Sequence, residues 1–494
     1  MLFTTGTFLF LYLPITLLGF FLTARIVGQR AGAAWLALAS LYFYAYWYAP
    51  DLILLIASIA FNYWAGSWIL SRRVASLALA RRILVMAVSV NLIVLAYFKY
   101  SNLLIGSVNQ VGGLHLPLLA VTLPIGISFF TFTQIAYLVD VYAGKVRERN
   151  PVHYTLFVTY FPHLIAGPVL HHAEMMPQFR MAENYRPWLR NFVMGLAFLG
   201  VGLAKKVLIA DTVAPWADEL FNAAKTGAVD AQLAWRGVLA YTLQIYFDFS
   251  GYSDMAVGLS RLVGVELPYN FNSPYKSVSI IDFWRRWHMT LSRFLRDYLY
   301  ISLGGNRKGP IRRYVNLALT MLLGGLWHGA SWTFMLWGGL HGLYLMINHA
   351  WVHLRKTVLV GLDAVPGWLG RWSGWALTLC SVMFAWIWFR AESTGASLNV
   401  IAGLMGGSSG SRVAGPLALE PIGWIVAGFL FAVLLANSQE VLDGRFKAWM
   451  QRMEGSGGAA FRFGAMIGVE VILITWLALV CASRQMTQFI YFNF

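Results

Sequence analysis

Two histidines, His288 and His328, are the residues of this chain whose type and setting could carry chemistry. His288 ends the aromatic and basic stretch Asp282–His288, and His328 lies 40 residues later inside the apolar run Met321–Trp332. Imidazole titrates at about pH 6.5 when unperturbed, so it can take a proton from a hydroxyl group at working pH. A polar, titratable group in a membrane segment costs a few kcal/mol unless it faces a cavity or a partner. The pattern therefore favours a histidine-based proton-transfer site. Packing of each histidine against a neighbouring helix is the alternative.

Charged side chains accompany both histidines. Four arginines recur at helical spacing around His288, and they suit an anionic ligand such as a phosphate; they are Arg285, Arg286, Arg293 and Arg296. Positive charge at the cytoplasmic end of a helix explains any one of them equally well. Asp248 and Asp254 lie within an apolar helical run, where they could orient a histidine or neutralise an arginine. For at least one of the two we expect a structural salt bridge.

Nearby glycines and the other histidines and cysteines were also considered for a role in a site. Gly324, Gly325 and Gly329 would allow a backbone or a ligand to approach His328 closely. His341 follows one segment later, and we favour helix packing over a supporting role at the site. His163, His171 and His172 are too scattered to form a metal site, and Cys380 and Cys481 have no metal-ligand or disulfide spacing.

The composition places these residues in a membrane protein. Of 494 residues, 59% are hydrophobic and only 12% are charged, whereas soluble domains carry about 25% charged residues. Repeated apolar runs of roughly 18 or more residues indicate membrane-spanning helices. Lipid forces each backbone group to pair within its own helix, so we predict an all-α polytopic membrane protein.

Charge patterning indicates sidedness rather than nucleic-acid binding. The net charge is +16, but the Lys and Arg residues cluster between apolar segments, as positive-inside topology requires. We expect Arg25 on the cytoplasmic side and no nucleic-acid partner. Such basic loops can attract anionic membrane lipid or a nucleotide-bearing donor.

Ten apolar segments are predicted to span the membrane. They are Thr7–Ala24, Ala33–Tyr48, Leu52–Leu70, Ile83–Phe98, Leu123–Tyr142, Leu317–Phe334, Met335–Trp351, Trp375–Trp388, Ile422–Ala436 and Gly464–Ala482. Residues 151–185 and 265–315 are instead rich in Pro, Gly, Asn, His and Arg. We expect them to form re-entrant or interfacial elements around a central site, because irregular backbone at membrane depth must be buried in protein or line a cavity. Ordinary cytoplasmic loops are the alternative.

Several motifs in a fixed order resemble those of a known family, the membrane-bound O-acyltransferases, and in particular its bacterial branch that O-acetylates exopolysaccharides. The motifs are Tyr246–Ala256, Asn270–Tyr275, Asp282–His288, Leu295–Tyr300, Leu326–Ala330 and the terminal Phe489–Phe494. The resemblance covers nearly the whole chain. It implies one integral membrane acyltransferase domain over residues 1–494, with N-terminal helices in 1–150, a catalytic core in about 151–350 and C-terminal helices in 351–494. It also implies a ring of tilted transmembrane helices with re-entrant elements around a central tunnel.

The resemblance also implies roles for individual residues. The family's catalytic histidine matches His328, and its second polar residue matches His288. The expected donor is acetyl-CoA, with Arg285, Arg286 and Trp327 at the donor-binding positions and no metal. His328 would act as the general base, while His288, with Arg285 or Arg286, would position the donor or stabilise the oxyanion. An acyl-histidine intermediate is the less favoured variant.

The expected function is O-acetyl transfer from cytoplasmic acetyl-CoA across the inner membrane. The resemblance implies a periplasmic SGNH-type acetyltransferase partner, a polysaccharide biosynthesis and secretion complex, and alginate as the polymer. The alternatives are acetylation of cellulose or peptidoglycan, and D-alanyl transfer from a carrier protein. A transporter, or a scaffolding subunit without catalysis, would also place polar, broken helices at membrane depth.

Overall fold

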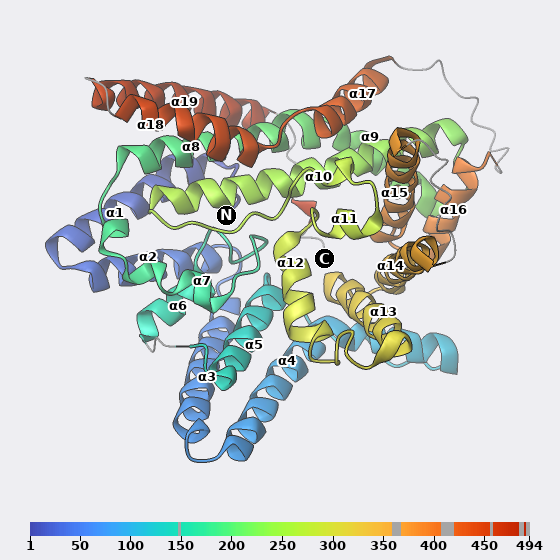
Figure 1. Ribbon diagram of the computed structural model, residues 1–494, viewed down its shortest axis with the longest axis horizontal. Helices are drawn as coiled ribbons and strands as arrows, with labels where there is room; N and C mark the ends of the chain where they lie inside the picture. The colour runs from blue at the N-terminus through green and yellow to red at the C-terminus, as the bar shows by residue number, and fades with distance from the viewer. Residues whose placement is uncertain (147–149, 358–366, 407–418, 455–457, 484–488, 491–494) are drawn as a thin grey trace. The chain divides into compact units, whose positions relative to one another are not determined.

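The structure, a computed structural model, describes residues 1–146, 150–357, 367–406, 419–454, 458–483 and 489–490 (Figure 1). In these ranges every regular element is a helix. The chain divides into two compact units. The first comprises Met1–Leu203, Gly251–Pro268 and Ser438–Met486, and the second comprises Ala204–Ser250, Tyr269–Asn437 and Thr487–Phe494. The prediction of an all-α membrane protein is confirmed by this helical content and by the candidate spans below.

The first unit is built mainly from the N-terminal helices. Its elements are η1 (Thr7–Tyr12), α1 (Leu13–Ile26), α2 (Gln29–Ala45), α3 (Asp51–Arg73), α4 (Leu77–Gly112), α5 (Ile127–Ala143), α6 (Pro151–Thr159), α7 (His172–Met175), η2 (Gln178–Arg180), η3 (Ala182–Tyr185), α8 (Leu189–Ala204, without its last residue), residues 251–262 of α10 (Ala231–Leu262), η7 (Glu440–Phe446), α18 (Lys447–Glu454) and α19 (Ala459–Ser483). Between α6 and α7 the irregular stretch 160–170 is fully buried in this unit. Buried irregular backbone is what we predicted for this region, and its depth in the membrane remains a prediction.

The second unit carries both histidines of interest. Its elements are η4 (Lys205–Ala210), α9 (Asp211–Thr226), most of α10 (Ala231–Leu262), η5 (Pro274–Lys276), α11 (Ile280–Trp284), α12 (Met289–Phe294), η6 (Leu295–Tyr300), α13 (Gly309–His328), α14 (Trp332–Thr357), α15 (Gly367–Arg390), α16 (Thr394–Leu404) and α17 (Leu419–Leu434). Short helices and turns fill residues 274–300, where we expected irregular structure.

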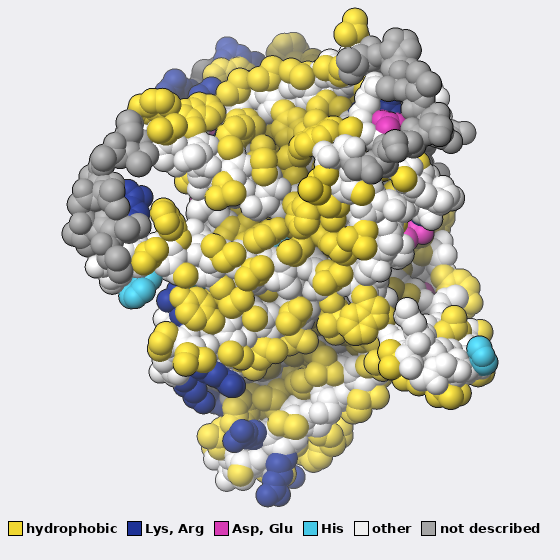
Figure 2. Space-filling view, turned by 90° about the vertical axis from the view of Figure 1, so that its right-hand side faces the viewer, with side chains coloured by type: hydrophobic (Ala, Val, Ile, Leu, Met, Phe, Trp, Pro, Cys, Tyr) yellow, Lys and Arg dark blue, Asp and Glu magenta, His cyan; other side chains and the backbone are white. Residues whose placement is uncertain are grey.

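Among the described residues, six helical runs are long and apolar enough to cross a membrane. They are Thr7–Ile26, Asp51–Arg73, Leu77–Gly112, Leu189–Thr226, Gly367–Arg390 and Ala459–Ser483. Apolar side chains on them are widely exposed, for example Leu18 at 64% and Leu479 at 65%, and hydrophobic side chains cover most of the face in Figure 2. Such exposure suits contact with lipid. The chain is therefore a multi-pass membrane protein.

Five of the ten predicted spans lie within these six runs. Three others coincide with helices outside the six runs, namely Ala33–Tyr48 with α2, Met335–Trp351 with α14 and Ile422–Ala436 with α17. Two further predicted spans have different bounds in the structure, and one run was not predicted. The span predicted at Leu317–Phe334 is wrong at its end, because α13 stops at His328 and α14 starts at Trp332. Gly329 adopts extended backbone there, and Ser331 accepts a hydrogen bond from Thr333 N at 3.3 Å. The predicted segment Leu123–Tyr142 begins only at Ile127. We missed the run Leu189–Thr226, because two adjacent lysines interrupt its apolar pattern.

Glycines bring α13 and α14 into backbone contact. A Cβ atom added at Gly325 would lie 2.3 Å from Phe334 O, and one at Gly338 would lie 2.3 Å from Met321 O. The predicted close approach of another backbone is thus confirmed at Gly325, one turn before His328. At Gly324 the nearest atom would be in the Leu295 side chain, at 3.3 Å.

We predict that Gly325→Ala lowers the thermal midpoint of the detergent-solubilised protein, because the new methyl group forces α13 and α14 apart. Overpacking of this kind costs about 1–3 kcal/mol. Gly339→Ala is the matched control, since its Cβ would meet only the Leu322 side chain at 3.5 Å. An equal midpoint in the two variants would contradict the assigned contact.

Candidate active site

His328 lies at the end of α13 in a cage of aromatic rings. Its imidazole centroid is 4.8 Å from that of Trp327, 5.0 Å from Trp337 and 5.2 Å from Phe389. Only 5% of the residue is exposed. Electrostatic and proton-transfer interactions are stronger in such a water-poor setting than in bulk solvent.

His288 is fully buried and has an unusual backbone conformation. It precedes α12 in the left-handed region, at φ 41° and ψ 54°, and Ser273 is the other non-glycine residue with positive φ in the described ranges. A residue held this way costs about 1–3 kcal/mol and persists only where its surroundings enforce it. The position of the imidazole is therefore fixed by contacts from other segments.

Asn270 supplies those contacts. Its backbone carbonyl accepts a hydrogen bond from Met289 N at 2.9 Å. Its side-chain Oδ1 accepts from Thr290 Oγ1 at 2.6 Å and lies 3.1 Å from His288 Nδ1. Asn270 lies in one of the sequence motifs, but we predicted no role for it. The signal in the sequence is an asparagine in a Pro- and Asn-rich stretch just before the histidine motif.

The Asn270 contact determines the tautomer of His288. A carboxamide oxygen only accepts hydrogen bonds, so Nδ1 must carry the proton. Burial lowers the pKa of His288 to about 3, so the ring is neutral at physiological pH and its Nε2 carries a lone pair. In this state Nε2 accepts hydrogen bonds and does not donate them.

Trp327 brings the two histidines into one site. Its ring centroid is 6.4 Å from that of His288 and 4.8 Å from that of His328. The structure therefore unites three of the five predicted site residues around a single indole. It places the other two differently. Arg286 donates to Asp282 Oδ1 at 2.9 Å and to Asn272 O at 3.3 Å, while Arg285 is exposed.

A buried charge network supports the wall behind His288. Lys206 Nζ lies 2.8 Å from both Asp211 Oδ1 and Asp248 Oδ1. Asp248 Oδ2 also accepts from Ile490 N at 2.9 Å. The next residue, Phe249, packs edge-on against His288 with centroids 4.7 Å apart. The predicted salt bridge for an aspartate in this helix is confirmed at Asp248; sequence reasoning missed Lys206.

Other carboxylates and histidines have structural contacts. Asp254 accepts from Ser438 Oγ at 2.9 Å in the first unit. His341 stacks on Phe283 with 6.1 Å between centroids and also contacts Trp337 at 5.0 Å. These ring contacts support its predicted packing role.

The remaining histidines line no metal centre. Across the described ranges, no group of three or more His, Cys, Asp or Glu residues could hold a metal ion. His163 Nε2 lies 2.9 Å from Phe157 O.

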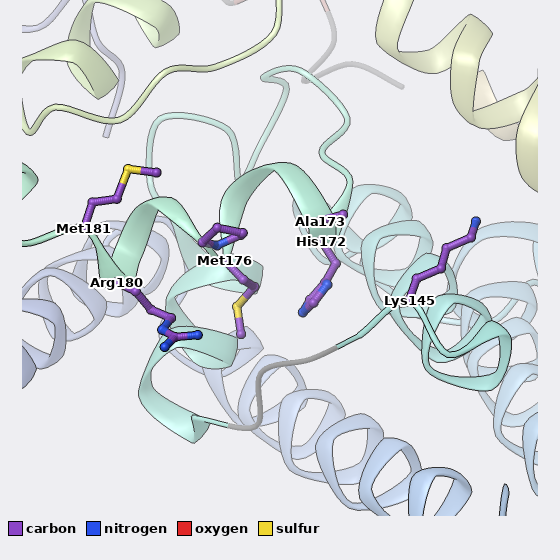
Figure 3. Close-up of a pocket in the computed structure, with 7 residues that line it drawn as sticks. Lys145, His172, Ala173, Met176, Arg180 and Met181 are labelled. Atoms are coloured by element: carbon purple, nitrogen blue, oxygen red, sulfur yellow. The ribbon is translucent and has the colours of Figure 1, made fainter.

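His172 borders a cavity of about 470 Å³ in the first unit, together with Lys145 and Arg180 (Figure 3). Asp140 lies 3.4 Å from Lys145, and burial lowers the pKa of His172 to about 4.

Comparison with known proteins identifies the family. Residues 94–385 match the model of MBOAT, the membrane-bound O-acyltransferase family. This chain belongs to the membrane-bound O-acyltransferases. The matched range contains His288, His328, Trp327 and Asn270, so the site described above lies within the acyltransferase region.

Individual relatives cover most of the chain. It is 42% identical over 432 residues to the peptidoglycan O-acetyltransferase of Helicobacter pylori, with 82% of this chain and 80% of the relative covered. It is 45% identical over 399 residues to the probable alginate O-acetylase AlgI of Pseudomonas aeruginosa, with 80% and 72% covered. A teichoic acid D-alanyltransferase of Streptococcus thermophilus is 27% identical over 290 residues, with 54% and 68% covered. The likeness to the two acetyl-transferring relatives is thus both closer and longer.

We predict that Asn270→Ala lowers the acyl-transfer rate of this O-acyltransferase by about 100-fold, because His288 loses the contact that fixes its ring and tautomer. Asn272→Ala is the matched control and should keep the rate within a few-fold. Asn270→Asp provides a second readout. A carboxylate at Nδ1 raises the pKa of His288, so activity should fall at mildly acidic pH, where wild type is unaffected. Wild-type rates and pH profile in both Asn270 variants would contradict the assignment.

We predict that Lys206→Met destabilises the enzyme by about 3–5 kcal/mol, because it leaves Asp248 and Asp211 buried without a counter-charge. Lys225→Met should cost about 0–1 kcal/mol, because its ion pair with Glu392 is exposed. Denaturant or thermal unfolding of the solubilised protein measures both. An equal loss of unfolding free energy in the two variants would show that the buried Lys206 ion pairs stabilise the fold no more than an exposed pair does.

Proposed function

We propose that this enzyme moves acetyl groups from cytoplasmic acetyl-CoA across the inner membrane to a periplasmic SGNH-type acetyltransferase, which O-acetylates a secreted polysaccharide within its biosynthesis and secretion complex. Alginate is the polymer we favour. The observation that carries the proposal is the pair of buried histidines that both contact the ring of Trp327, in a chain 45% identical to a probable alginate O-acetylase. Membership in an acyltransferase family removes the transporter alternative and makes a purely scaffolding role unnecessary.

The proposed chemistry assigns the proton transfer to His328. Its imidazole takes the proton of an acceptor hydroxyl while that oxygen attacks the thioester carbonyl carbon. The carbon–sulfur bond then breaks, the new oxygen ester forms, and the imidazolium returns the proton to the departing thiolate. The direct route requires no acyl-histidine.

His288 has the complementary task of positioning. Nδ1 is held by Asn270, so Nε2 of the neutral ring can only accept a hydrogen bond. This supports an interaction with a substrate hydroxyl or with an amide N–H of the donor. It favours positioning over stabilisation of an oxyanion, which needs a donor. Arg285, which is exposed, is better placed than Arg286 to attract the phosphates of the donor, since Arg286 is paired with Asp282. We assign Trp327 to the donor-binding wall between the two imidazoles.

Peptidoglycan is the second candidate acceptor. The Helicobacter pylori relative covers 82% of this chain at 42% identity, which is as extensive as the match to the alginate relatives. D-alanyl transfer has weaker support, because the matching relative is 27% identical over 54% of the chain. Cellulose has no support beyond the general chemistry of a sugar hydroxyl.

We predict that His328→Ala abolishes ester-linked acetyl on the target polymer when it replaces the wild-type gene. His341→Phe is the matched control and should retain acetylation, because the contacts of His341 are ring packing. Proton NMR of secreted polysaccharide and of base-released acetate from peptidoglycan, at equal membrane levels of each variant, identifies the polymer. Retained acetyl on both polymers in His328→Ala cells would exclude the proposed base.

The donor is tested separately. Titration calorimetry with purified protein should detect binding of acetyl-CoA and no binding of a D-alanyl carrier protein. Binding of the loaded carrier protein alone would replace the acetyl-transfer proposal with D-alanyl transfer.

A further inference from the structure

A long apolar groove runs along the first helix of the first unit. It has a volume of about 1040 Å³ and is bordered by α1, by α8, by α19 and by residues 182–187. One face of the continuous helical run η1–α1 lines it from Leu9 to Arg25. The facing helices contribute residues at helical spacing, such as Leu196 on α8 and Val471 on α19. Every residue that lines the groove belongs to the first unit.

The groove is open to the surroundings of the membrane spans. Its α1 and α19 walls belong to the candidate spans Thr7–Ile26 and Ala459–Ser483. Side chains on those walls are partly exposed, among them Phe10 at 52% and Val471 at 45%. Walls made of apolar side chains from candidate membrane spans suit acyl chains rather than a soluble ligand.

One end of the groove is cationic. Arg25, in the last turn of α1, and Arg186, just before α8, are the charged residues among those that line it. Both side chains are exposed, and no carboxylate lines the groove to neutralise them. By the positive-inside pattern this end faces the cytoplasm. An anionic headgroup is therefore the complement of this end, where guanidinium groups bind phosphate oxygens well.

We propose that this groove is a binding site for one anionic phospholipid of the cytoplasmic leaflet. Its phosphate lies between Arg25 and Arg186, and its acyl chains follow the apolar stripe of α1 between α8 and α19. The lipid fills a space that protein side chains leave open. The proposal is independent of which acyl group the enzyme transfers and of the polymer that receives it.

The test compares lipids on the purified full-length protein in detergent. Phosphatidylglycerol should raise the thermal midpoint and remain bound in native mass spectrometry, while phosphatidylcholine with the same chains should do so weakly. Inorganic phosphate should have no effect. Equal effects of the two lipids would overturn the headgroup assignment, and an effect of phosphate alone would point to a site for a free anion.

Variants locate the site. The double substitution Arg25→Gln and Arg186→Gln should reduce phosphatidylglycerol affinity by about an order of magnitude, while Arg72→Gln on α3, away from the groove, should leave it unchanged. Leu17→Trp, which places an indole in the groove, should weaken both lipids. Unchanged binding in the double variant, or an equal loss in Arg72→Gln, would reject the groove. If the double variant fails to fold, Leu17→Trp and the comparison of the two lipids on the wild-type protein still test whether an anionic lipid binds in this groove.

Discussion

The hydrogen bond from His288 to the side chain of Asn270 is the interaction on which the candidate site depends. It places the proton of His288 on Nδ1, and it holds a residue whose left-handed backbone would otherwise relax. The same carboxamide oxygen accepts from Thr290, so the turn before α12 and the segment at Asn270 are joined at one point. A neutral imidazole surrounded by rings would otherwise be free to change both tautomer and orientation.

A buried ion cluster in the second unit brings opposite charges together. Lys206 lies beside both Asp211 and Asp248. Desolvation makes such a network costly to form and more costly to break. Asp248 of this network is followed directly by Phe249, whose ring packs on His288. The network therefore also holds the part of α10 that contacts His288.

Two kinds of helix contact are found in the rest of the structure, close backbone packing and an open apolar groove. The backbone contact between α13 and α14 at Gly325 and Gly338 lies within one turn of Trp327 and His328, at the end of α13. In the first unit the opposite arrangement is found beside α1, where helices leave an apolar groove with a cationic end. Small residues bring α13 and α14 together beside the candidate site, whereas large apolar side chains line the groove beside α1.

The sequence by itself determined the membrane class, most of the spans and the two histidines. Each of these is a local property: the length of an apolar run, the alternation of basic loops, or a polar residue in an apolar context. Tertiary structure decided what the sequence left open, namely that Asn270 orients His288, that the ring of Trp327 contacts both histidines, and that Lys206 compensates Asp248. Residues 491–494, part of the terminal motif, lie outside the described residues, but Ile490 illustrates the same limit. Its backbone N–H binds Asp248 across 242 residues of sequence, and no local periodicity encodes such a partner, because the pairing is chosen by which buried groups meet once the helices have packed.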